Sequence, residues 1–219
     1  MSSRTKRILR IYLPITLVVI IIAVLIAFFL LRNTIKAKDY FDALNGSNYT
    51  KQVQTTTIKD NNTLIYEKIE TIVFDGDNVY HRIEEKQLSE NVDADYEQTI
   101  TEFYYSKNKM YYFEDNIWKA EDFTVSKRLK TYYLKTDYFS TIKFNKKIEK
   151  EGKLQGNIKD DCADKIVTGS DLKNMSLIII VNKKFDVQKF DITANTQSGR
   201  DVEIKNVYTY LDETVVMPV

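Results

Sequence analysis

The chain of 219 residues contains few of the residue types that carry most protein chemistry. It has one cysteine, one histidine, two prolines and six glycines. A single cysteine excludes a disulfide within the chain, and one cysteine with one histidine supply too few ligands for a thiolate–imidazole zinc site. The sequence also lacks a G-x-S-x-G turn and a glycine-rich phosphate loop. We therefore predict no enzyme, no cofactor and no metal site.

An excess of positive charge is also missing. Lysine and arginine number 32 and aspartate and glutamate 31, and every acidic residue follows residue 31, where acids outnumber bases. A dedicated nucleic-acid surface needs a basic stripe. This balance predicts that nucleic acid is not a partner.

One long apolar run is present, from Ile11 to Leu31, and it contains no charged residue. As a helix its 21 residues span about 32 Å, close to the ~30 Å hydrocarbon thickness of a bilayer. The run ends in Phe28 and Phe29 followed by two leucines, whereas a cleaved signal peptide ends in small residues. We therefore predict a transmembrane helix at residues 11–31 that acts as a signal anchor.

The orientation of this helix follows from its flanks, because lysine and arginine are enriched on the cytoplasmic side. The bases before the run are Arg4, Lys6, Arg7 and Arg10, and those just after it are Arg32, Lys36 and Lys38. Four against three favours a cytoplasmic tail at residues 1–10. We expect a single-pass plasma-membrane protein whose C-terminal domain is extracytoplasmic.

Beyond the predicted anchor, residues 32–48 are expected to form a juxtamembrane helix. Its apolar side chains, among them Tyr40, Phe41 and Leu44, recur at helical spacing, and Asn45-Gly46-Ser47 ends the pattern. Residues 49–219 contain no internal repeat and no low-complexity linker, which predicts one β-rich domain.

Alternating apolar and polar residues, separated by turn residues, predict a mainly antiparallel α+β domain. The turn at Asp75 to Asn78 is typical of a hairpin; a calcium loop fits poorly, because Tyr80 and Lys86 occupy its sixth and twelfth positions. Between Asp122 and Phe139 the spacing becomes helical, which predicts a mid-chain helical insertion. The predicted strands are Tyr49–Ile58, Leu64–Phe74, Val79–Leu88, Tyr96–Ser106, Met110–Phe113, Ile117–Ala120, Thr141–Glu149, Lys165–Thr168, Ser176–Val181, Phe185–Thr193 and Val202–Tyr210.

Two patterns within the strands bear on function. Ser176–Val181 is apolar at every position after the serine, so both of its faces should be covered, either by the mid-chain helix or by an apolar cavity. Aromatic residues crowd a predicted hairpin, and adjacent tyrosines in each strand place rings on both faces. Cross-strand aromatic pairs stabilise a sheet by about 0.2–1 kcal/mol each, and a platform for carbohydrate or peptide is the alternative. These residues are Tyr104, Tyr105, Tyr111, Tyr112, Phe113 and Trp118.

The remaining polar candidates favour structural roles. His81 lies beside Arg82 in a predicted strand, where a solvated strand face is expected. Asp160, Asp161 and Asp164 surround Cys162 in a polar segment and are expected to be solvated loop acids.

The order of the elements is informative. A leading helix ends in Ala43-Leu44-Asn45-Gly46-Ser47-Asn48-Tyr49 and opens into a first strand; a meander and a helical insertion follow; the chain closes with Leu177–Asn182, Phe185–Thr193 and Val202–Tyr210. This order is similar to the LolA/LppX-type lipoprotein-carrier superfamily of bacterial cell-surface proteins. The resemblance implies a strongly curved, half-barrel-like sheet that wraps helices and holds an acyl chain. Many relatives carry a lipid on cysteine; a transmembrane anchor suits sensing or holding a ligand better than shuttling it.

We therefore expect a non-enzymatic binding domain that is integral to the membrane. The leading hypothesis is an apolar or acyl ligand, a lipid or a lipoprotein, held or sensed in the curved sheet. The alternative is a structural or protein-interaction module of the cell envelope without a small-molecule ligand. The residues expected to line an apolar ligand are Leu177, Ile178, Ile179, Ile180, Tyr104, Tyr112 and Trp118.

Overall fold

The computed structural model describes residues 18–28, 38–88, 96–123, 142–144, 152–167 and 171–218. The chain divides into two compact units, Met1–Asp39 and Tyr40–Val219. In the first unit, residues 18–28 form a helix whose apolar side chains are exposed. Among the described residues, no helix combines the length and the apolar character needed to cross a bilayer. The other residues of the predicted anchor, 11–17 and 29–31, lie outside the described part of the chain, so the anchor stays a prediction.

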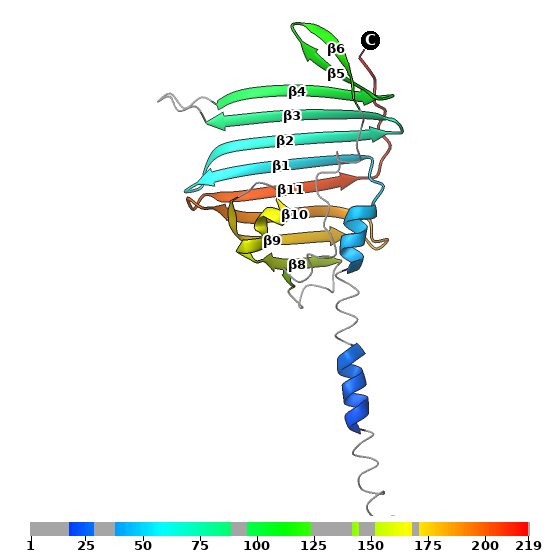
Figure 1. The fold of residues 1–219 in the computed structure, drawn as a ribbon, viewed down its shortest axis with the longest axis vertical. Helices are drawn as coiled ribbons and strands as arrows, with labels where there is room; N and C mark the ends of the chain where they lie inside the picture. Colours follow the sequence, from blue (N-terminus) through cyan, green and yellow to red (C-terminus); the bar gives the residue numbers. More distant parts are fainter. Residues whose placement is uncertain are drawn as a thin grey trace, which may run out of the picture. The chain divides into compact units, whose positions relative to one another are not determined.

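The second unit is built on one sheet of eleven strands, in which every pairing is antiparallel. The strands are β1 Lys51–Asp60, β2 Thr63–Asp75, β3 Asn78–Leu88, β4 Tyr96–Ser106, β5 Lys109–Glu114, β6 Ile117–Asp122, β7 Ile142–Phe144, β8 Lys153–Ile158, β9 Leu172–Val181, β10 Val187–Thr196 and β11 Asp201–Thr209. Their order is β6-β5-β4-β3-β2-β1-β11-β10-β9-β8-β7, so the first and last strands are neighbours (Figure 1). The predicted antiparallel α+β class is confirmed.

Tight hairpins join consecutive strands that are neighbours in this order, and their turn residues tolerate the positive φ that such turns need. Asn61 and Asn62 have φ of 48° and 68° between β1 and β2, and Gly76 has φ of 58° between β2 and β3. Turns of this kind match the twist of the flanking strands. The β2–β3 pairing joins Asp75 to Asn78, which confirms the predicted hairpin at this position.

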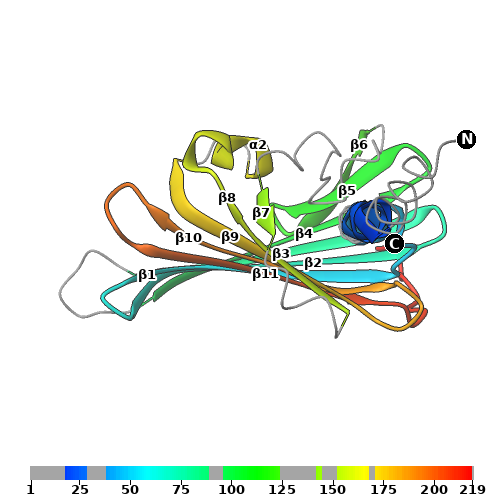
Figure 2. The same cartoon turned by 90° about the horizontal axis from the view of Figure 1, so that it is seen from below.

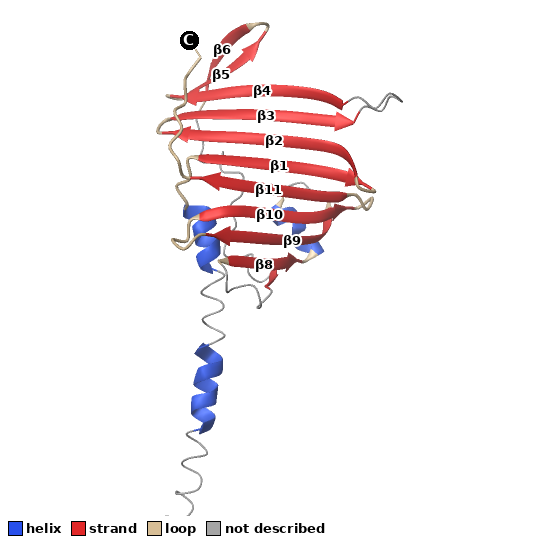
Figure 3. Ribbon diagram, turned by 180° about the vertical axis from the view of Figure 1, so that it is seen from behind, coloured by secondary structure: helices blue, strands red, loops and turns tan. Residues whose placement is uncertain are grey.

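The sheet has two unlike faces, which strand alternation keeps separate. We call the face that carries Leu177 the inner face and the face that carries Ile178 the outer face. The short helix α2, Ala163–Ile166, covers one face of the sheet, the inner face (Figure 2). In Figure 3 the sheet is seen from its other face, and α2 lies behind the strands. The core sits on the inner face of β8–β11. Its most deeply buried side chains, all at most 1% exposed, are Leu154, Met175, Leu177, Ile179, Val187, Phe190 and Ile192.

The helix of residues 38–46 contributes to this core. Tyr40, Phe41 and Leu44 are exposed by only 3%, 0% and 3%. The helix predicted from their helical spacing is confirmed over residues 38–46, and its position beside a membrane stays a prediction. Residues 32–37 of that predicted helix lie outside the described part of the chain.

Three points of local structure need correction, and two predicted segments lie outside the described residues. Lys165–Thr168 was expected to be a strand, but Lys165 and Ile166 belong to the helix α2, which buries Cys162, Ala163 and Ile166. The strand β8 was missed, because Gly152 and Gly156 weaken the strand signal. Phe185 was assigned to a strand, but it lies in the β9–β10 turn with φ of 64°. Residues 124–139 of the predicted helical insertion and 145–149 of a predicted strand lie outside the described residues.

Gly152 is required by a close approach between two backbones. Its φ is +69°, and a Cβ atom built there would lie 2.6 Å from the carbonyl oxygen of Val181. At Gly76, φ is +58° but the space around a Cβ is empty.

We predict that Gly152→Ala destabilises the protein by about 2 kcal/mol or more, because it adds a clash to an unfavourable φ. The matched variant Gly76→Ala should lose only about 1 kcal/mol, since it meets the φ penalty alone. Denaturant unfolding of both variants measures the difference. Equal losses would show that the contact with Val181 does not demand glycine.

Candidate functional site

Strands β3 to β6 expose a group of aromatic rings on the outer face. The register pairs Tyr80 with Tyr104 and Phe113 with Trp118, and alternation sends all four rings to the same side. The ring centroids of Tyr80 and Tyr104 are 4.9 Å apart, and the ring of Trp118 lies 5.3 Å from those of Tyr104 and Phe113. Phe113 is 55% exposed. We call these four residues the outer aromatic surface.

The tyrosines of this surface are hydrogen-bond donors and not nucleophiles. The hydroxyl of Tyr80 donates to Oε1 of Glu102 at 2.6 Å. Burial, and then Glu102, raises the pKa of Tyr80 above its ordinary value, and burial likewise raises the pKa of Tyr104. Both phenols therefore stay protonated at neutral pH.

The planes of these rings are tilted against one another. The interplanar angle is 43° between Tyr80 and Tyr104, 81° between Tyr104 and Trp118, and 57° between Phe113 and Trp118. The tilted rings form an uneven surface and not a flat platform.

The inner face of strands β2 to β5 carries a second apolar group. Ile72, Val79 and Tyr105 are buried, and Phe74, Phe103 and Met110 pack against them while only partly buried. We call these six residues the inner apolar cluster. The adjacent tyrosines in the sequence predicted aromatic rings on both faces of the sheet, and this is confirmed.

A belt of polar side chains crosses the inner face between the inner apolar cluster and the core on β8–β11. The two groups still meet at one point, where the ring centroid of the buried Tyr49 lies 5.7 Å from that of Phe74 and 4.8 Å from that of Tyr208. Gln52 and Asn206 are 1% and 0% exposed, and the amide of Gln52 donates to Oδ1 of Asn206 at 3.1 Å. The amide of Asn206 in turn donates to the carbonyl oxygen of Phe190 at 2.8 Å. Buried amides are tolerated only when hydrogen-bonded in this way.

The belt continues across β2 and β3 as charged groups. The amide of Gln54 donates to Oε2 of Glu70 at 3.3 Å, while Nε2 of His81 and Nζ of Lys68 each lie 3.4 Å from Oε1 of Glu70. The interaction with His81, and then Lys68, holds the pKa of Glu70 below its ordinary value against the opposing effect of burial. The side chain of His81 is only 12% exposed, so the expected solvated position was wrong. Polar and charged groups therefore interrupt the inner face at Gln54, Glu70 and His81, while Tyr49 connects its apolar parts.

The seven residues expected to line an apolar ligand fall in different places. Leu177 and Ile179 are fully buried on the inner face, whereas Ile178 and Ile180 are half-buried on the outer face. The apolar strand is thus covered completely on one side and partly on the other.

The aromatic members of that set lie far from β9. Tyr104 and Trp118 contact each other on the outer face, and Tyr112 points inward, where its hydroxyl donates to Oε1 of Glu121 at 2.7 Å. Strands β4 and β9 are six positions apart in the sheet, about 29 Å along its surface. The described structure brings Tyr104 and Trp118 together but does not join the seven residues into one lining.

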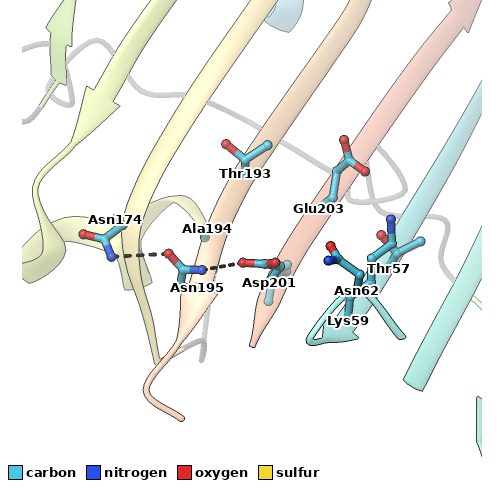
Figure 4. Close-up of a pocket in the computed structure, with 10 residues that line it drawn as sticks. Thr57, Lys59, Asn62, Asn174, Thr193, Ala194, Asn195, Asp201 and Glu203 are labelled. Carbon is cyan, nitrogen blue, oxygen red and sulfur yellow. Dashed lines mark hydrogen bonds between the residues drawn. The ribbon is translucent and has the colours of Figure 1, made fainter. Parts of the chain in front are cut away.

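A polar depression of about 340 Å³ lies where β1 and β9–β11 end on the outer face (Figure 4). Its amides satisfy one another, because Asn174 donates to Asn195 at 3.3 Å and Asn195 donates to Asp201 at 2.8 Å. The described residues contain no group of three histidine, cysteine or acidic side chains placed to hold a metal ion. The depression is lined by Thr57, Lys59, Asn62, Asn174, Thr193, Ala194, Asn195, Asp201, Val202 and Glu203.

Sequence reasoning missed two members of these surfaces. Tyr80 belongs to the outer aromatic surface, and Glu70 meets His81 in the polar belt. Both pairings are cross-strand contacts. Register counted from the turn at Asp75 to Asn78 places Glu70 diagonally opposite His81, so that contact could have been found. The pairing of Tyr80 with Tyr104 joins β3 to β4, and this turn does not set its register.

We predict that Glu70 makes stability depend on pH. Its folded pKa is lowered, so its stabilising contribution is present above its unfolded pKa and is lost as pH falls through the folded value. Between pH 5 and pH 3 the wild-type chain should lose on the order of 1 kcal/mol more free energy of unfolding than Glu70→Gln. Urea unfolding of the detergent-solubilised chain measures this, with Glu97→Gln as an exposed control. Parallel pH profiles of wild type and Glu70→Gln would contradict the assignment.

Comparison of the sequence with known proteins found no match. No protein-family model matches the chain, and no curated protein matches it. Among solved structures, the chain is similar to the crystal structure of LprF from Mycobacterium bovis. The sequence identity is 11%, the match covers 85% of this chain and 95% of LprF, and the TM-score is 0.42.

Proposed function

We propose that this chain is a membrane-anchored, non-enzymatic binding domain that contacts a protein of the cell envelope through the outer aromatic surface. The observation that carries the proposal is the continuous contact of four aromatic rings on the outer face. Phe113 is exposed and Tyr80, Tyr104 and Trp118 are half-buried. Tyrosine and tryptophan dominate the binding energy of many protein interfaces, because they bury a large area at a small cost in conformational entropy.

The architecture supports this use of the surface. All four rings project from paired strands, so their positions are held by the backbone hydrogen bonds of the sheet. A rigid surface loses less entropy when a partner binds. The Tyr80 hydroxyl is already bonded to Glu102, which leaves its ring as the contact surface.

The anchor is part of the proposal. The uncharged run at residues 11–31 is long enough to span a bilayer, and the helix of residues 18–28 with its exposed apolar side chains supports this. In this arrangement residues 1–10 are cytoplasmic and the β-rich domain is extracytoplasmic.

An apolar or acyl ligand is the second candidate. The inner apolar cluster supports it, because Phe74, Phe103 and Met110 are only partly buried. Leu177 and Ile179 are fully buried, so the candidate surface for an acyl chain is the part of the inner face on β2–β5.

Adjacent residues of β4 point to opposite faces, so Phe103→Ser and Tyr104→Ser form a matched pair that separates the two candidates. We introduce a photo-crosslinking amino acid at Phe113 in the full chain in cells. A protein partner predicts a discrete crosslinked adduct that Tyr104→Ser reduces about tenfold, as expected for loss of a hot-spot residue, while Phe103→Ser retains it.

Native mass spectrometry of the same full-length variants tests the second candidate. A bound lipid that Phe103→Ser loses and Tyr104→Ser keeps would favour the acyl ligand. Urea unfolding verifies that both variants are folded. An adduct that forms equally in both variants, or no adduct at all, would refute the role of the outer aromatic surface.

A further inference from the structure

The turn between β9 and β10 presents an exposed aromatic ring between charged neighbours. Phe185 is 46% exposed and adopts a φ of 64°, and the two preceding residues, Lys183 and Lys184, are exposed. A left-handed backbone is unfavourable for a large side chain and persists only where the surroundings enforce it. The ring of Phe185 is covered in part by its contact with Tyr40 and is otherwise exposed.

Asn182 enforces the turn. Its side-chain oxygen accepts hydrogen bonds from the backbone N–H groups of Lys184 at 2.8 Å and Asp186 at 3.0 Å, and its carbonyl accepts the N–H of Phe185 at 3.0 Å. Its amide also donates to Oδ2 of Asp186 at 2.9 Å, so that carboxylate is engaged within the turn. Asp186 keeps its negative charge but is half-buried, whereas Lys183 and Lys184 are exposed.

Chain connectivity ties this turn to the predicted anchor. The ring of Phe185 lies 5.7 Å from that of Tyr40, edge to face. Tyr40 follows Leu31, the last residue of the predicted span, by nine positions. Nine residues reach about 30 Å when fully extended and about 13 Å when helical. If the predicted span crosses a bilayer, chain length alone keeps Tyr40 within about 30 Å of the end of that span.

We propose that the β9–β10 turn docks on an anionic phospholipid bilayer, with Phe185 at the headgroup–acyl boundary and Lys183 and Lys184 beside lipid phosphates. Aromatic rings favour this boundary, and lysines near it are attracted to anionic lipid. The neighbouring acid Asp42 lies beside the turn in a shallow depression shared with Asp186 and Tyr210. The contact orients the extracytoplasmic domain, and it rests on the anchor of the proposed function.

Single-tryptophan versions of the full chain test the contact in vesicles of phosphatidylcholine and phosphatidylglycerol with brominated acyl chains. In a Trp118→Phe background, Phe185→Trp reports on the turn and Phe28→Trp reports on the predicted span. Ser198→Trp is the control, because it lies in the exposed β10–β11 turn at the other end of a ten-residue strand, about 33 Å away.

Bromine should quench the fluorescence of Phe28→Trp, within the predicted span, and of Phe185→Trp, at the lipid boundary, about twofold each. It should leave the fluorescence of Ser198→Trp unchanged, because that ring lies in water beyond the boundary. Adding Lys183→Glu and Lys184→Glu should weaken quenching at position 185 in the anionic vesicles. If position 28 is quenched while position 185 behaves like position 198, the docking proposal is refuted and the anchor stands. If position 28 is not quenched, the anchor itself fails, and docking with it.

Discussion

The antiparallel pairing of β1 with β11 is the interaction on which the described domain depends. It joins Lys51 to Thr209 and continues without a shift to Lys59 and Asp201. Without it, the meander β1–β6 and the strands β7–β11 would be two separate sheets, each with an exposed edge. Side chains reinforce the joint at one end, where Lys51 pairs with Glu213 at 2.9 Å and the Thr50 hydroxyl donates to the carbonyl oxygen of Leu211 at 2.6 Å.

This register also decides what each face of the sheet can do. It places Gln54 opposite Asn206 on the inner face, so the joint between the two halves is polar on that side. The core lies on one side of the joint and the inner apolar cluster on the other. Buried amides at such a joint favour one register, because a slip by one residue would leave them without partners.

The surfaces available for binding follow from the same geometry. The outer aromatic surface lies near one edge of the sheet, on β3–β6, while the β9–β10 turn lies toward the opposite edge. A domain that docks on lipid through Phe185 would leave Phe113 and its neighbours, several strands away, accessible to a protein partner. Anchoring and recognition then occupy separate parts of the sheet and do not compete.

The sequence by itself determined the local features. Asparagine and glycine at positive φ set the hairpins, strand alternation divided the aromatic residues between two faces, and helical spacing placed Tyr40, Phe41 and Leu44 in the core. These features depend on residues close together in the chain. The uncharged run at residues 11–31 is likewise a local signal, and the anchor inferred from it stays a prediction.

Only the tertiary structure decided the rest. Residues 165 and 166 were predicted to lie in a strand, but they belong to the helix α2, in which Ile166 is buried. Gly152 is needed just before β8, because its backbone comes close to the carbonyl oxygen of Val181. The meeting of Glu70 with His81 and the separation of Leu177 from Tyr104 likewise follow from strand order and register. Pairings between distant segments carry no local signal, because they are selected by the burial of whole faces and not by neighbouring residues.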